Sequence, residues 1–195
     1  MTTVNLECKC GEVKGTATDI TPSSGTRVVC CCSDCQAFAV HLERDGDTLD
    51  KSGGTEIFQV SQSQVTIQQG HDKLQSLRLT DTGLLRWYTS CCNTPVGNTI
   101  NARLPFVGII HTFMKVPKRG SVLGPVRAVV QTQYAKGTPD YPKHSRKFPI
   151  GITLRIVRKM VVWKSQGKHT PSVFFSDDGV PTAAPIVLTQ NNNDT

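Results

Sequence analysis

Cysteine is the residue type in this 195-residue chain whose number and spacing point most directly to chemistry. All eight cysteines fall within the first 92 residues, in three groups: Cys8 and Cys10, then Cys30, Cys31, Cys32 and Cys35, then Cys91 and Cys92. In a reducing compartment, grouped cysteines bind a metal or take part in catalysis more often than they form disulfides. The grouping therefore predicts one or two thiolate metal sites, with zinc as the expected ion.

The middle group has the spacing C-x-C-x-x-C and stands in a loop that opens a short expected helix. Cys30, Cys32 and Cys35 would supply three thiolates and leave a fourth position open, which is the arrangement of catalytic zinc. Three thiolates on a divalent ion leave a net charge of about −1, which weakens its Lewis acidity. Such a site favours holding a soft thiolate, or the hydroxymethyl oxygen of a thiol adduct, over hydrolysing a peptide or an ester.

Three ionisable side chains are candidates for assisting the triad of Cys30, Cys32 and Cys35. Asp34 lies inside the loop and could orient a ligand or a water, or could simply cap the helix. His41, shortly after the triad, and His111 are candidate proton carriers. A lone histidine in an apolar run can equally be a packed or a surface residue.

The outer cysteines predict a second, structural site. Cys8 and Cys10 are two residues apart, so in an extended segment both point to one face, and Gly11 permits the turn that brings them onto one ion. Cys91 and Cys92 lie far along the chain, as expected of a site that staples the ends of a sheet together. Such a site contributes folding energy, because the unfolded chain has no preformed metal site.

The elements that must position these thiols are mainly strands. Up to residue 114 the chain has short alternating runs broken by turn residues, which predict small antiparallel sheets. The runs are 4–8, 12–18, 56–60 and 64–67. Residues 74–79 and 84–88, separated by 80–83, predict a hairpin that enters the last cysteine pair.

The amino-acid composition of the chain changes after residue 115, where Pro, Gly and Lys become frequent. Residues 149–163 predict a helix with Pro149 near its first turn and with Arg155, Arg158 and Lys159 on one side. The β-branched content of this segment leaves a strand possible. We expect three parts: a zinc domain over 3–115, a basic extension over 116–188 that packs on it, and a disordered tail over 189–195.

Composition places the chain among soluble proteins with a core of their own. It is 37% hydrophobic and 19% charged, and its length suits one domain that needs no disulfides. The amino terminus lacks a basic region followed by an apolar one, and no apolar stretch is long enough to span a membrane. We therefore expect a cytoplasmic protein with no membrane partner.

The net charge of +7 is concentrated in the carboxy-terminal half. Residues 115–168 contain thirteen Lys or Arg and the single acid Asp140, whereas residues 1–114 contain nine basic and eleven acidic residues. A basic surface attracts nucleic acid, an acidic protein surface or a small anionic substrate such as glutathione. It can also be a solvated face without a partner.

The order of the motifs adds a resemblance. The motifs are Cys8-x-Cys10-Gly11, Cys30-x-Cys32-x-x-Cys35, and Arg86-x-Tyr88 leading into Cys92-x-Thr94-Pro95. Over about residues 3–115 this order resembles the glutathione-dependent formaldehyde-activating enzyme and centromere protein V (GFA/CENP-V) family. The resemblance implies a zinc-containing β-tent of small antiparallel sheets. It also implies either a carbon–sulfur lyase that joins formaldehyde to glutathione or a structural protein.

The resemblance also implies roles for the cysteines. The triad would carry the reactive zinc, and Cys8 and Cys10 would share a structural zinc with a later C-x-x-C. Here the chain departs from the pattern, since the first cysteine of that later motif would fall at Thr89. Adjacent Cys91 can substitute only if the chain turns there, because neighbouring residues of a strand point to opposite faces.

Asn93 and Pro95 make such a turn plausible. We expect Cys91 to be the fourth ligand; otherwise the structural site is incomplete. Cys31, the extra thiol of the triad loop, is expected to be a buried neighbour and not a ligand.

Two functions of different classes follow. The first is a zinc-dependent carbon–sulfur lyase-type enzyme that acts on a small anionic thiol adduct, such as one of glutathione. The alternative is a non-catalytic zinc module whose basic half binds nucleic acid or a cytoskeletal or other protein surface. The basic stretch has few interleaved aromatic residues, which disfavours nucleic acid. An iron–sulfur or redox-disulfide protein fits the cysteine spacing less well.

Overall fold

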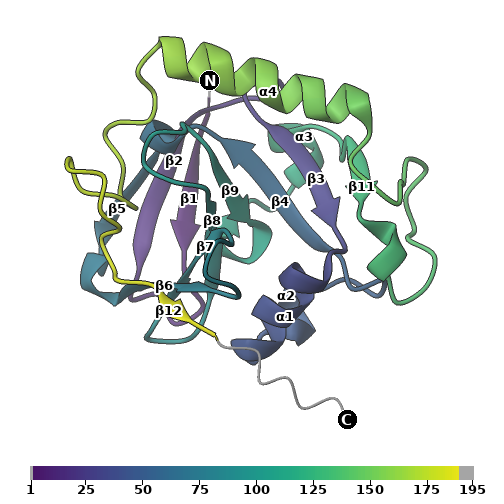
Figure 1. Cartoon of the computed structure of the whole chain (residues 1–195), viewed down its shortest axis with the longest axis horizontal. Helices are drawn as coiled ribbons and strands as arrows, with labels where there is room; N and C mark the ends of the chain where they lie inside the picture. The colour runs from purple at the N-terminus through teal and green to yellow at the C-terminus, as the bar shows by residue number, and fades with distance from the viewer. Residues whose placement is uncertain (1, 189–195) are drawn as a thin grey trace.

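The computed structural model describes residues 2–188, which fold into two sheets with helices around them (Figure 1). The smaller sheet has the order β10-β1-β2-β5, with β1 at Thr2–Glu7, β2 at Lys14–Ile20, β5 at Val65–Gln69 and β10 at Met114–Lys115. The prediction of a mainly β protein is confirmed.

The larger sheet has the order β11-β3-β4-β9-β8-β7-β6-β12. Its strands are β3 (Thr26–Cys30), β4 (Thr55–Val60), β6 (Leu74–Arg78), β7 (Leu85–Thr89), β8 (Pro95–Thr99), β9 (Val107–Ile110), β11 (Ala128–Val130) and β12 (Ile186–Val187). Most neighbours are antiparallel, as predicted, but the two edge strands β11 and β12 pair in parallel with β3 and β6. The sequence pattern did not indicate these parallel pairs, because each is only two or three residues long.

The helices lie between the strands and along the edges. They are α1 (Ser33–His41), α2 (Asp45–Thr48), α3 (Arg119–Leu123), α4 (Ile150–Ser165) and the 3-10 turns η1 (Gln62–Gln64), η2 (His71–Lys73), η3 (His111–Phe113) and η4 (Thr132–Tyr134). The predicted short helix after the triad is confirmed as α1. Among residues 2–188, no helix has both the length and the apolar character that crossing a membrane requires.

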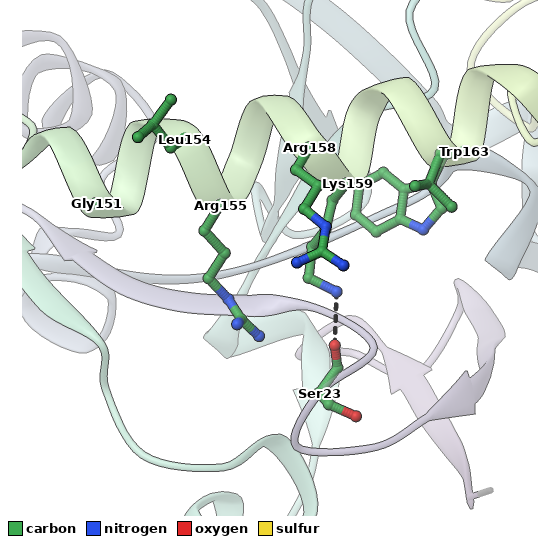
Figure 2. A pocket seen from close by; sticks show the side chains of 8 residues that line it. Ser23, Gly151, Leu154, Arg155, Arg158, Lys159 and Trp163 are labelled. Atoms are coloured by element: carbon green, nitrogen blue, oxygen red, sulfur yellow. Dashed lines mark hydrogen bonds between the residues drawn. The ribbon is translucent and has the colours of Figure 1, made fainter.

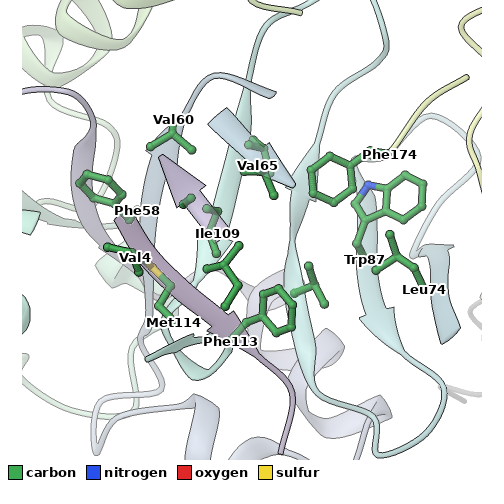
Figure 3. Packing of buried hydrophobic residues seen from close by; sticks show 14 of the residues in the cluster. Val4, Phe58, Val60, Val65, Leu74, Trp87, Ile109, Phe113, Met114 and Phe174 are labelled. Carbon is green, nitrogen blue, oxygen red and sulfur yellow. The ribbon is translucent and has the colours of Figure 1, made fainter. Parts of the chain in front are cut away.

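The core fills the space between the sheets (Figure 3). The alternation of side chains along each strand determines which residues form this core. In β1, Val4 and Leu6 point inward, whereas Thr3 and Asn5 are exposed. Trp87 is fully buried, donates a hydrogen bond from Nε1 to Thr99 Oγ1 at 2.9 Å and packs against Phe174 with ring centroids 5.1 Å apart. These contacts fix β7, the strand that leads to Cys91 and Cys92.

The predicted hairpin is confirmed, with Leu74 of β6 opposite Thr89 of β7. The predicted helix near 149–163 is confirmed as α4, which begins after Pro149 and lies along the outer edge of the molecule (Figure 1). Residues after 115 complete the larger sheet through β11 and β12 and supply Phe174 to the core. The predicted tail at 189–195 lies outside the described residues.

Candidate metal sites

The four outer cysteines come together although they lie far apart in the sequence. Cys8, Cys10, Cys91 and Cys92 have sulfur atoms that all lie within 4.8 Å of one another. The Cys8–Cys10, Cys10–Cys91, Cys8–Cys91 and Cys91–Cys92 sulfur distances are 3.5, 3.3, 3.8 and 3.8 Å. Four sulfurs at the corners of a tetrahedron around zinc, with Zn–S bonds of about 2.3 Å, are about 3.8 Å apart. The donor set and its spacing therefore fit a tetrahedral zinc ion.

Two turns, one after a strand of each sheet, bring these cysteines together, so the group joins the two sheets and not the ends of one sheet, as the sequence had led us to expect. After β1, Gly11 adopts a φ of +81° and donates its N–H to the Cys8 carbonyl at 3.2 Å. After β7, Asn93 adopts a φ of +53° and donates its N–H to the Thr89 carbonyl at 2.8 Å. Glycine and asparagine tolerate this left-handed conformation best.

The predicted turn after β7 is therefore present. It places adjacent Cys91 and Cys92 in one cluster, which a continuing strand could not do.

Two threonines support the second turn, and the sequence reasoning did not identify them. Thr94 Oγ1 accepts the Lys9 N–H at 3.0 Å and lies 3.2 Å from Cys92 Sγ, so it links the two turns. The resemblance places a cysteine at position 89. The chain has Thr89 there, and its Oγ1 lies 3.5 Å from Cys92 Sγ. Burial opposes ionisation of Cys92, but the hydroxyl contacts from Thr89 and Thr94 outweigh it and lower the pKa of Cys92 to about 5. The only sequence signal for this role was the position of Thr94 between Cys92 and Pro95.

The middle cysteines form a separate group built from local structure. The sulfurs of Cys30, Cys32 and Cys35 lie within 4.8 Å of one another. Cys30 ends β3, Cys32 is the N-cap of α1, and Cys35 stands in the first turn of α1. The Cys35 N–H points at Cys32 Sγ at 3.4 Å. Partial positive charge at a helix N-terminus favours thiolates there.

Arg86 of β7 provides a full positive charge beside this triad. Its side chain is 3% exposed, and Nη1 lies 4.0 Å from Cys35 Sγ. The guanidinium also contacts Asn98 Oδ1 at 3.4 Å and Asp34 Oδ2 at 3.2 Å. A buried cation needs such partners, because its desolvation is otherwise uncompensated. The sequence motif placed Arg86 only on the way to the last cysteine pair, since no local pattern ties it to Cys35, 51 residues away.

The thiols of the triad depend on one another for their charge. Hydrogen bonds with Cys30 and Cys35, together with the charge of Arg86, lower the pKa of Cys32 to about 3. The hydrogen bonds with Cys32 and Cys35, and then burial, raise the pKa of Cys30. A hydrogen bond with Cys30 lowers the pKa of Cys35. The contact with Cys32 and burial outweigh this effect and raise the pKa of Cys35 to about 12. One thiolate is therefore stable by itself, whereas three together need a cation such as a divalent metal.

The other predicted site residues lie at different distances from the triad. Asp34 is beside it and pairs with Arg86, with 57% of its side chain exposed. His41 is exposed in the last turn of α1, at the end opposite Cys32 and Cys35. His111 begins η3 and is half-buried, with Nδ1 unpaired among the described residues. Cys31 is fully buried and packs with Val29 and Val129, so it is a neighbour of the triad, as predicted.

Comparisons with known proteins give a family and one structural likeness. The family model described as "Family of unknown function (DUF6151)" matches residues 1–185. Among curated proteins, none matches the chain. A crystal structure of a Rhodobacter sphaeroides protein, a Northeast Structural Genomics target, is similar with a TM-score of 0.43 and 16% identity, over 63% of this chain and 96% of that chain.

Proposed function

The chain belongs to the family of unknown function DUF6151, and we propose that it is a two-zinc protein with one structural and one reactive site. Cys8, Cys10, Cys91 and Cys92 would hold the structural ion, and Cys30, Cys32 and Cys35 the reactive one. The observation that carries the proposal is the difference in donor number between the two groups. A site with four protein thiolates is complete, whereas a site with three can accept an external ligand.

The part of the chain that the structure describes offers the triad no fourth donor of the usual kinds. Among residues 2–188, no further Cys, His, Asp or Glu ligand atom joins the three sulfurs within 4.8 Å. Asp34 is the nearest candidate in sequence, but its carboxylate pairs with Arg86 at 3.2 Å. The fourth position would therefore belong to a water or a substrate. This is the reason for assigning reactivity to the triad and not to the four-cysteine group.

The surroundings of the triad favour an anionic ligand. Cys30 and Cys35 are buried, whereas Cys32 is half-buried and Asp34 is exposed, so a ligand would approach from the start of α1. The helix N-terminus and the Arg86 guanidinium both place positive charge there. Arg86 offsets the net charge of about −1 that three thiolates leave on a divalent ion, while the carboxylate of its partner Asp34 is largely exposed to solvent. Zinc, when bound, would supply Lewis acidity toward a thiolate or an alkoxide oxygen.

These features support a carbon–sulfur lyase-type reaction on a small thiol adduct, such as the hydroxymethyl adduct of glutathione. In the cleavage direction the hydroxyl loses its proton, a carbonyl forms, the carbon–sulfur bond breaks, and the thiolate leaves and takes up a proton. In this chain, Asp34 is the exposed ionisable group beside the triad that could move the proton. The choice of substrate rests on the motif resemblance over residues 3–115 to the glutathione-dependent formaldehyde-activating enzyme family.

A non-catalytic zinc module is the second candidate, and one observation favours it. The triad sulfurs are mostly buried, while the basic residues of the carboxy-terminal half line surface grooves. Under this alternative both metal ions would be structural, and the basic surface would contact an acidic partner. In either case we place the protein in a reducing compartment such as the cytoplasm, because both sites need free thiols.

Metal content per chain tests the two-site proposal. Elemental analysis of the wild type should give two zinc ions, and Cys32→Ser should give about one with the fold retained. Cys31→Ala is the matched control, because it removes a thiol from the same loop without touching a predicted ligand. A wild type that holds one ion, which Cys32→Ser leaves in place, would refute the triad site.

Turnover tests the reactive role separately. The zinc-loaded wild type should accelerate breakdown of the hydroxymethyl adduct of glutathione, and Cys32→Ser should abolish this acceleration. Two bound zinc ions without any acceleration would favour the non-catalytic module.

A further inference from the structure

A basic groove lies between α4 and the loop that precedes β3, away from both cysteine groups (Figure 2). Its volume is about 520 Å³. The lining residues are Ser23, Gly151, Leu154, Arg155, Arg158, Lys159, Val162 and Trp163. Arg155, Arg158 and Lys159 direct their charged ends from the helix toward the loop at Ser23 (Figure 2). The sequence prediction that these three lie on one side of the helix is thus confirmed.

The positive charge of the groove has no matching negative charge. None of its lining residues is acidic. Within residues 2–188, Arg155, Arg158 and Lys159 are absent from the salt bridges. Lys159 Nζ donates to the carbonyls of Ser23 and Ser24, the latter at 3.0 Å, and lies 5.6 Å from the centroid of the Trp163 ring, so backbone dipoles and an aromatic face compensate it without any anion.

The two arginines of the groove differ in how many of their N–H groups already donate a hydrogen bond. Arg155 Nη2 donates to the Gly25 carbonyl at 3.3 Å, while its Nε is buried without a partner in the described structure. Arg158 is exposed at the mouth of the groove, and its guanidinium forms no hydrogen bond within residues 2–188. Its five donors are therefore free for a ligand.

Mutual repulsion makes the groove more favourable for an anion. Burial, followed by repulsion from Arg127 and Arg158, lowers the pKa of Arg155. Burial, followed by repulsion from Arg155 and Arg158, lowers the pKa of Lys159. Like charges that are held together and partly desolvated are relieved when an anion binds between them.

We propose that the groove formed by Arg155, Arg158, Lys159 and Ser23 is a binding site for a phosphate monoester. A guanidinium binds a phosphate through two parallel hydrogen bonds, and an ammonium adds a compact charge. A dianion between three cations suits this charge count better than a carboxylate does. Ser23 closes the groove from the facing loop, where its hydroxyl lies 3.2 Å from Thr21 Oγ1.

This site is independent of the proposed zinc chemistry. The groove lies at the Thr26 end of β3, whereas Cys30 of the triad lies at the other end of that strand (Figure 1). A failed zinc proposal would leave the groove unchanged, and a failed groove would leave the cysteine groups unchanged.

The phosphate could belong to a soluble ester or to a lipid headgroup. The outward face of α4 exposes Ile150, Leu154, Val157 and Val161, at spacings of four, three and four residues, and Leu154 also lines the groove. An apolar stripe beside basic side chains is the pattern of helices that lie on a membrane surface. A soluble ester and a lipid headgroup can present the same phosphate monoester, so the groove itself does not distinguish between them.

Titration calorimetry with inorganic phosphate and glycerol 3-phosphate, at an ionic strength held constant with chloride, tests the soluble arm. Flotation with vesicles of phosphatidylcholine alone, or with added phosphatidic acid or phosphatidylserine, tests the lipid arm. Either saturable one-to-one binding of glycerol 3-phosphate or selective binding to phosphatidic acid would support the site. Equal binding to both acidic lipids without binding of glycerol 3-phosphate would mean general charge attraction and would overturn the proposal, as would the absence of binding in both arms.

Variants assign the binding to the groove. Arg158→Gln should weaken binding about tenfold, because it removes a charged donor pair, and Arg158→Lys should restore part of it. Lys164→Gln removes the same charge from α4 outside the groove and should change the affinity by less than about twofold. Equal losses for Arg158→Gln and Lys164→Gln would refute the proposal. Circular dichroism of each variant checks that α4 is intact.

Discussion

Both cysteine groups offer sulfur donors, but they differ in how far apart in the sequence their members lie. The four-cysteine group joins two turns that lie more than 80 residues apart, and its exposed member is Cys10. The three-cysteine group comes from one strand end and the first turn of the helix that follows, and Arg86 is the distant residue that brings a positive charge to it. In the two-zinc proposal, the first arrangement would tie the fold together, and the second would prepare a charged position on a fold that already exists. The separation of the cysteines along the chain therefore adds a second difference to the difference in donor number.

Removal of Cys91 should have the largest effect on the stability of the protein. Cys91→Ala opens the four-cysteine group, and a structural metal contributes its binding energy to folding, so the loss should reach about 4 kcal/mol or more. For a chain of this size that corresponds to roughly 10 °C in the unfolding temperature, measured by circular dichroism. Ser90→Ala, in the same turn, is the control and should remain close to wild type.

A chelator sharpens this prediction. It should lower the unfolding temperature of the wild type by more than that of Cys91→Ala, which has only the triad ion left to lose. If Cys91→Ala is as stable as Ser90→Ala, the four-cysteine group is not a structural metal site.

Replacement of Arg86 should affect only the triad. Arg86→Met removes the charge beside Cys35 while keeping a long side chain, and the zinc affinity of the triad should fall about 10–100-fold. Competition with a colorimetric chelator measures the two affinities separately, and the four-cysteine affinity should not move. Arg86→Lys keeps the charge and should recover part of the loss. A parallel fall at both sites would show that Arg86 acts only through the fold.

Replacement of Asp34 should have a smaller effect, and it tests whether the triad is open. Asp34→Asn breaks a pair in which the carboxylate is largely exposed, so the zinc affinity should change by less than about threefold. Competition with the same colorimetric chelator measures the zinc affinity of the triad in this variant. A loss greater than tenfold would make Asp34 a fourth ligand and would remove the main difference between the two cysteine groups.

The pH dependence of stability should contain a small contribution that belongs to neither group. Burial, and then repulsion from Arg119, lowers the pKa of His111. The unfolded chain therefore binds this proton more readily than the folded one, so stability decreases as the pH falls below about 6.5, the ordinary histidine value. Chemical unfolding of wild type and His111→Gln at pH 7 and pH 5 measures it, with a shallower loss expected for the variant. Identical slopes would show that His111 does not contribute to the acid sensitivity.

Much of the fold followed from patterns within short segments. Alternation located β1, β2, β4 and β5, the turn residues between 74–79 and 84–88 located the hairpin, and Pro149 located the start of α4. The strands β3, β8 and β9 were not predicted, because they are buried along almost their whole length and show no alternation. The parallel edge strands β11 and β12 were missed, because pairing of two or three residues leaves no periodic signal. Thr94 was missed for a related reason, since its partner Lys9 is 85 residues away.

The sequence by itself determined which residues can donate to a metal and how they are grouped, because ligand chemistry and short spacing are local properties. It also determined that Cys91 could act only if the chain turned after β7. Only the tertiary structure decided that this turn exists, that Cys8 and Cys10 meet it, and that Arg86 stands beside the triad. The physical reason is that contacts between distant segments depend on sheet register and core packing, which no single segment encodes.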